Sequence, residues 1–178
     1  TAGYPDRPAI ARLSLPFYER IGDAPKLAAA NEALLGVADT RGEKVERLEK
    51  LRGLYGGAAN DPAGAYRVSM ALFDIDPADG KNRDALLGFA DAAGKTGELA
   101  EKLRKVSGET DDQLLRRDLL VVVAELQEKR LGRAQDAEQV YAQILQAEPL
   151  HAGAFRALTR LYRDGQRWAE LRALLDAR

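Results

Sequence analysis

The sequence lacks several residue types and patterns that many functions require. It has no cysteine among its 178 residues, which excludes disulfides, thiolate catalysis and cysteine-ligated zinc. With a single histidine, it also has no nucleophile–base pair of the usual sort, so we expect no enzyme activity. The longest apolar run, residues 119–124, is far shorter than the ~20 residues that span a bilayer. We therefore expect no membrane insertion.

The chain also lacks an excess of either charge. It carries 27 Lys and Arg and 28 Asp and Glu, for a net charge of −1, and the two signs are interspersed. A nucleic-acid-binding domain usually has a clear basic surplus, so we expect no nucleic-acid partner. The missing cysteines fit a reducing compartment, which favours a cytoplasmic location.

The residues that are present favour helices. Hydrophobic residues make up 46% of the chain and charged residues 31%, as in a folded protein rather than a disordered one. Leu and Ala, which are strong helix formers, dominate the apolar positions. Val, Ile, Thr and the aromatic residues are too scattered to build several strands. The composition therefore predicts an all-α fold.

A long period runs through the whole chain. Pro5, Pro77 and Pro149 follow one another at steps of 72 residues. The same step relates two series of large apolar residues, namely Phe17, Phe89 and Leu161, and Leu27, Leu99 and Leu171. A fixed long period is typical of stacked repeats, in which each unit buries its apolar face against its neighbours. We predict one array with a half copy at 1–40 and full copies at 41–108 and 109–178, and we interpret the chain as a processed chain or a piece of a longer protein.

Helical spacing within the period predicts about ten helices in five antiparallel pairs of ~36 residues each. The segment 111–131 is typical, and Asp111 and Asp112 are placed to cap its start. Gly132 should end that helix, and Pro77 and Pro149 should end the helices before them. Pro16 predicts a kink or a late start in the first helix. The predicted helices centre on residues 9–20, 25–37, 45–55, 66–73, 86–89, 99–106, 111–131, 135–147, 155–164 and 167 onward.

The spacing of Ala137, Tyr141, Ile144 and Pro149 resembles the closing half of a tetratricopeptide repeat, and Ala124 fits the small residue of its first helix. The chain departs from that motif in three ways. Gln127 replaces an aromatic residue, one residue lengthens the turn at 132–134, and alternate pairs such as 155–175 match loosely. The resemblance implies a right-handed α-solenoid of a divergent bacterial type, with no cofactor or metal.

In arrays of this family the first helix of each pair lines a concave groove that binds peptides or partner proteins. The resemblance implies a groove that is acidic in its middle and basic at its C-terminal end. It would favour a partner with basic residues beside an acidic patch or a carboxyl terminus. No Asn accompanies the Lys and Arg, so we do not expect the family's carboxylate clamp for chaperone tails. The implied groove residues are Glu46, Glu49, Lys81, Asp84, Asp91, Asp118, Val121, Glu125, Glu128, Arg156, Arg160 and Arg163.

Many of these charges fit equally well on solvated helix faces. Arg156, Arg160 and Arg163 are the most informative, because they share one face at i, i+4 and i+7, where uncompensated like charges repel. We take Arg156 and Arg160 to be solvated, so that reversing both charges should abolish partner capture without changing helicity or melting. Equal capture would point away from the groove.

Three features look like chemical sites but have simpler interpretations. Residues 94–97, Gly-Lys-Thr-Gly, lack the upstream glycine and the strand of a phosphate-binding loop, which favours a polar turn. Residues 74–80 resemble a calcium loop, but Ala78 and Ala85 stand where ligands are needed. His151 comes shortly after Pro149 and is interpreted as a surface residue of a turn.

The sequence is compatible with three functional hypotheses. The leading one is a non-catalytic scaffold that binds a protein or peptide. The second is a structural spacer or assembly module of a larger protein, with no ligand of its own, and the third is a helical fragment of an enzyme. Trp168, which should open the last helix, predicts an exposed apolar end and weak self-association through it.

Overall fold

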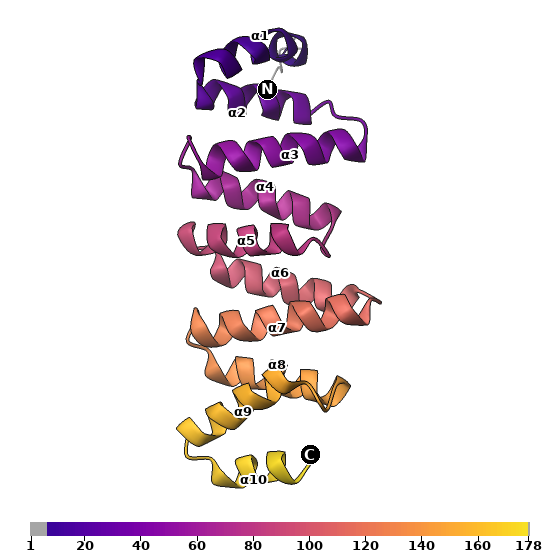
Figure 1. The fold of residues 1–178 in the computed structure, drawn as a ribbon, viewed down its shortest axis with the longest axis vertical. Coiled ribbons are helices and arrows are strands. Elements are labelled where there is room, and N and C mark those ends of the chain that lie inside the picture. Colours follow the sequence, from indigo (N-terminus) through magenta and orange to yellow (C-terminus); the bar gives the residue numbers. More distant parts are fainter. Residues whose placement is uncertain (1–6, 178) are drawn as a thin grey trace. The chain divides into compact units, whose positions relative to one another are not determined.

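A computed structural model describes residues 7–177, which form ten helices and no strand (Figure 1). This confirms the predicted all-α fold, in which consecutive helices within each part of the chain pack against each other. The helices are α1 (Arg7–Ile21), α2 (Ala24–Leu35), α3 (Arg41–Gly56), α4 (Pro62–Ile75), α5 (Gly80–Ala92), α6 (Thr96–Glu109), α7 (Gln113–Lys129), α8 (Ala134–Ala147), α9 (Ala152–Asp164) and α10 (Trp168–Asp176).

The helix starts recur at the spacing of the sequence period. Helices α2, α6 and α10 begin at Ala24, Thr96 and Trp168, each 72 residues after the last. Helices α4 and α8 begin at Pro62 and Ala134, which are again 72 residues apart. Both α4 and α8 end two residues before the matched prolines 77 and 149, whereas proline 5 lies outside the described residues. The spacing thus relates α1 to α5 and α9, α2 to α6 and α10, α3 to α7, and α4 to α8.

Local residues fix the ends of the helices. The Asp112 carboxylate accepts hydrogen bonds from the backbone N–H groups of Leu114 and Leu115 at 2.9 and 3.1 Å, and so caps α7 as predicted. Gly132 follows α7 with a φ of 66°, a left-handed conformation that glycine adopts without strain.

The expected late start at Pro16 is wrong, because α1 begins at Arg7 and continues through the proline. A proline inside a helix leaves the carbonyl four residues earlier, here that of Arg12, without its partner. Both Pro16 and Arg12 are exposed, so water can take the place of the missing donor. A kink at Pro16 stays a prediction.

The chain divides into two compact units, one up to Gly94 and one from Lys95. In unit 1 one core cluster lies between α3 and α4 and also receives a residue from α2, while a smaller cluster joins α1 to α2. The buried residues of the α3–α4 cluster are Ala28, Leu48, Leu51, Val68 and Leu72, and those of the smaller cluster are Ala11, Ala30 and Leu34. The division into repeat copies at residues 40 and 108 stays a prediction from the sequence.

Unit 2 is built around α7 and α8. Ala124, the small residue of the implied motif, is fully buried, and so are Val123 of α7 and Val140 of α8. Helix α9 adds Ala154 and Leu158 to the buried set. Helix α10 contributes no buried residue, so its apolar side chains are at best partly covered.

Candidate functional site

A cleft lies between α7, α8 and α9 in unit 2. Its volume is about 350 Å³, and we call it the α7–α9 cleft. Helix α7 supplies one wall of the cleft. Helix α9 and the preceding residue His151 supply the other wall, and α8 contributes Tyr141. The lining residues are Val121, Glu125, Lys129, Tyr141, His151, Gly153, Ala154, Arg156, Ala157 and Arg160.

The cleft brings together predicted site residues from two helices. Val121 and Glu125 of α7 line it together with Arg156 and Arg160 of α9, although the two pairs are far apart in the sequence. Each pair lies at i and i+4, so both members share the face that their helix presents to the cleft. A fifth predicted residue, Glu128, contacts this set through an ion pair.

Glu128 is the charged centre of the site. Its side chain is only 8% exposed, and its two oxygens have different partners. One lies 2.5 Å from Nη2 of Arg160, and the other accepts a hydrogen bond of 3.1 Å from the Tyr141 hydroxyl. Burial, together with the Glu128 carboxylate, raises the pKa of Tyr141 well above its ordinary value, so this hydroxyl stays a donor at neutral pH.

This ion pair corrects our view of the arginine stripe. Arg160 is compensated by Glu128, so it is not simply a solvated like charge beside Arg156. Reversing Arg160 would place a second carboxylate against the nearly buried one of Glu128. We therefore expect Arg160→Glu to destabilise unit 2, so the double reversal should lower the melting temperature rather than leave it unchanged.

Arg156 has no partner. Its side chain is exposed at the edge of the cleft and makes no hydrogen bond, ion pair or ring contact with any residue in 7–177. Lys129 lies in the same cleft, but its ammonium is 3.1 Å from the Glu125 carboxylate. Arg163 is also exposed and free of partners within the described chain, but it does not line the cleft. Arg156 is therefore the cation that the cleft offers to a ligand.

His151 has a structural role that the sequence did not indicate. Its Nδ1 accepts a hydrogen bond of 3.1 Å from the backbone N–H of Ala154, so His151 caps the start of α9. It is half-buried and lines the cleft, which agrees only in part with its interpretation as a surface residue of a turn. The available signal was its position directly before a helical segment, where an acceptor side chain is favoured.

The other predicted site residues lie elsewhere. Asp118 is on α7, and its carboxylate lies 2.8 Å from the guanidinium of the neighbouring Arg117 rather than in the cleft. In unit 1, Glu46 pairs with Lys50 one turn later at 2.8 Å. The remaining candidates are exposed on α3 and α5, namely Glu49, Lys81, Asp84 and Asp91. A groove that includes both units therefore stays a prediction.

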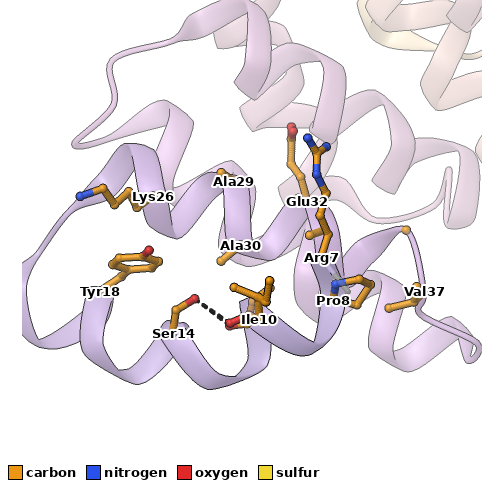
Figure 2. Close-up of a pocket in the computed structure, with 13 residues that line it drawn as sticks. Arg7, Pro8, Ile10, Ser14, Tyr18, Lys26, Ala29, Ala30, Glu32 and Val37 are labelled. Carbon is orange, nitrogen blue, oxygen red and sulfur yellow. Dashed lines mark hydrogen bonds between the residues drawn. The ribbon is translucent and has the colours of Figure 1, made fainter. Parts of the chain in front are cut away.

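A larger cleft, of about 710 Å³, lies between α1 and α2 in unit 1 (Figure 2). The alanines Ala29 and Ala30 face it from α2, and their small side chains leave the space open. At one end the Lys26 ammonium lies 5.6 Å from the centre of the Tyr18 ring. No motif in the sequence indicates this cleft, although the alanine run in α2 is a signal for close or incomplete packing.

The two motifs that resemble chemical sites are turns. Lys95 precedes α6 and pairs with Glu98 at 2.9 Å, as expected for a polar turn. Asp76 follows α4 as its C-terminal cap residue, and Asp79 caps α5 by accepting from the backbone N–H of Lys81 at 3.0 Å. Residues 7–177 contain no cluster of three or more potential metal ligands. Within the same residues no helix has the length and apolarity needed to cross a membrane.

Comparison with known proteins adds no identification: no family model, no curated protein and no solved structure matches the chain. The function is therefore inferred from the geometry of the clefts and of the exposed helix faces.

Proposed function

We propose that the chain is a non-catalytic scaffold that binds a protein or peptide in the α7–α9 cleft, in a helical array of tetratricopeptide type. The observation that carries this proposal is the unpaired Arg156 at the edge of a cleft whose other cations, Lys129 and Arg160, are already paired. A free guanidinium beside a concave surface favours an anionic ligand. The proposed compartment is the cytoplasm.

The walls of the cleft indicate the chemistry of the partner. Val121 on α7 and Ala157 on α9 offer apolar surface next to the Arg156 guanidinium. A planar guanidinium binds a carboxylate with two parallel hydrogen bonds. We therefore propose a peptide segment that places a carboxylate, from an acidic side chain or a carboxyl terminus, beside an apolar side chain.

Arg156→Glu tests this proposal better than the double reversal. Because Arg156 has no partner, the variant should keep the helicity and melting temperature of the native chain. It should lose a partner that the native chain retains in affinity capture from the source cells. Arg163→Glu is the matched control, since it makes the same charge change on the same helix outside the cleft. Capture that is equal for all three proteins, or lost equally in both variants, would contradict binding at the cleft.

A second candidate function is an assembly module of a larger structure, with no ligand of its own. Two exposed apolar helix faces favour it, since Leu13 of α1 is 85% exposed and Trp168 of α10 is 60% exposed. This alternative predicts that neither arginine variant changes capture.

A further inference from the structure

Helix α1 carries an exposed apolar stripe. Ile10, Leu13, Phe17 and Ile21 follow one another at steps of three and four residues, so they share one face of the helix. Their exposed fractions are 60%, 85%, 49% and 51%. Four large apolar side chains aligned on one face are typical of an interaction surface rather than of scattered surface residues.

The same face is covered in α5, which lies 72 residues later. Asn82 corresponds to Ile10 and is fully buried, and Phe89 corresponds to Phe17. The preceding hairpin, α3–α4, covers them. The Asn82 amide donates to the Ser69 carbonyl of α4 at 3.0 Å and accepts from the Arg52 guanidinium of α3 at 2.9 Å.

Helix α9 repeats this arrangement inside unit 2. Ala154 and Ala157 correspond to Ile10 and Leu13, and they are only 1% and 8% exposed. Helix α9 packs on α8, the second helix of the preceding hairpin α7–α8. In both units, therefore, the preceding hairpin buries the start of the equivalent face, at Asn82 and Ala154, whereas the position equivalent to Ile21 is half-buried in one copy (Ala93) and exposed in the other (Gly165).

We propose that the α1 stripe is the docking surface for a helical hairpin of the α7–α8 type, joined ahead of Pro5. Pro5 supports this connection, because it matches Pro77, which follows α4, and Pro149, which follows α8.

The internal copies also indicate which hairpin fits. Where the face carries Asn82, the preceding hairpin supplies Arg52 to pair with it. Where the face carries Ala154, the position equivalent to Arg52 is the fully buried Ala124. Because Ile10 is apolar, a hairpin with an arginine at the position of Arg52 would bury that arginine without a partner. A hairpin with a small apolar residue at this position would bury no unpaired polar group.

A labelling experiment on fusion proteins tests the proposal. Residues 113–148 are placed directly ahead of Pro5, which reproduces the native junction before Pro149. Because the chain has no cysteine, Leu13→Cys introduces a single reactive thiol on the stripe. We expect the fusion to slow labelling of this thiol by at least about tenfold, because reagent then reaches it only when the hairpin opens.

Two controls make the result specific. Glu19→Cys places the thiol on the same helix, where the equivalent residues Asp91 and Arg163 are exposed, so its labelling rate should not change with the fusion. A second fusion carries residues 41–76, which bring Arg52, and it should protect Leu13→Cys less than the first.

Three outcomes would overturn the proposal. The first is equal labelling of Leu13→Cys with and without the hairpin, and the second is a fused segment that gains no helix by circular dichroism in either fusion. The third is a labelling rate of Leu13→Cys in the unfused chain that falls as the protein concentration rises. In that case a second copy of the chain would occupy the α1 stripe. Equal protection by both fusions would overturn the assignment of the α7–α8 type.

Discussion

A buried amide on α7 has an oxygen without a partner. Gln127 is 7% exposed, and its Oε1 is fully enclosed without a hydrogen-bond donor among the described residues. Leaving a buried acceptor unpaired costs about 1–3 kcal/mol, so this position lowers the stability of unit 2.

Replacing this amide should stabilise the protein. Gln127→Met keeps the length of the side chain and removes the unpaired oxygen, so we expect the free energy of unfolding to rise by about 1 kcal/mol. Urea unfolding measures the change. Gln146→Met, the same substitution at an exposed position of α8, should leave stability within about 0.5 kcal/mol. A loss of stability in Gln127→Met alone would mean that the amide contributes favourably.

Residue roles that depend on sequence neighbours could be predicted, whereas those that depend on other helices could not. The capping role of Asp112 was predictable from the residues directly after it. The pairing of Arg160 with Glu128 depends on how α9 lies against α7, and no local pattern in either helix indicates it. For the same reason Arg156 and Arg160 looked equivalent in the sequence, although only Arg156 is free.

Among the elements, α2, α3 and α4 meet at one carboxylate. The Tyr55 hydroxyl of α3 donates to Glu32 of α2 at 2.6 Å, and the Arg67 guanidinium of α4 binds the same oxygen at 2.5 Å. Partial burial and the hydrogen bond to Glu32 raise the pKa of Tyr55 to about 12. The Tyr55 hydrogen bond in turn lowers the pKa of Glu32.

These shifts predict how stability depends on pH. The ordinary pKa of a tyrosine is about 10, so the folded state holds the Tyr55 proton more tightly than the unfolded state does. The resulting stabilisation is fully present below pH 10 and is lost as the pH rises from about 10 to about 12. The stability advantage of the native chain over Tyr55→Phe should therefore shrink across this range. Unfolding at a series of alkaline pH values measures it, and a constant difference would contradict the assignment.

The sequence predicted the helices more closely than the spaces between them. Apolar periodicity and the punctuating Pro and Gly residues placed most helix ends within a few residues, because both act over one or two turns. Pro16 was misread because a breaking residue is tolerated where its neighbourhood is exposed. The α1–α2 cleft was missed because it depends on the side-chain volumes of two helices together.

For the whole molecule, α10 presents the other exposed apolar face. Its Leu175 corresponds to Leu103 of α6, which is 2% exposed, yet Leu175 is 52% exposed. Trp168 precedes it by two turns and is 60% exposed. Helix α6 packs on α7, the helix that follows it, whereas α10 packs on α9, the helix that precedes it.

This face should cause weak self-association. Removing apolar surface from water gains about 25 cal/mol per Å², but a single short helix offers far less area than a standard interface, so the dimer should form only at high concentration. Sedimentation velocity over a concentration series measures this. Leu175→Glu should abolish the rise of the sedimentation coefficient with concentration. Arg172→Glu, which changes an exposed residue of the same helix, should retain this rise.

If Leu13→Glu abolishes the rise of the sedimentation coefficient instead, the contact is the α1 stripe. Both this prediction and the proposed hairpin docking would then lose their basis. A clean monomer at every concentration would show that the exposed face of α10 is too small to drive association, and would leave the docking of a hairpin on α1 unaffected.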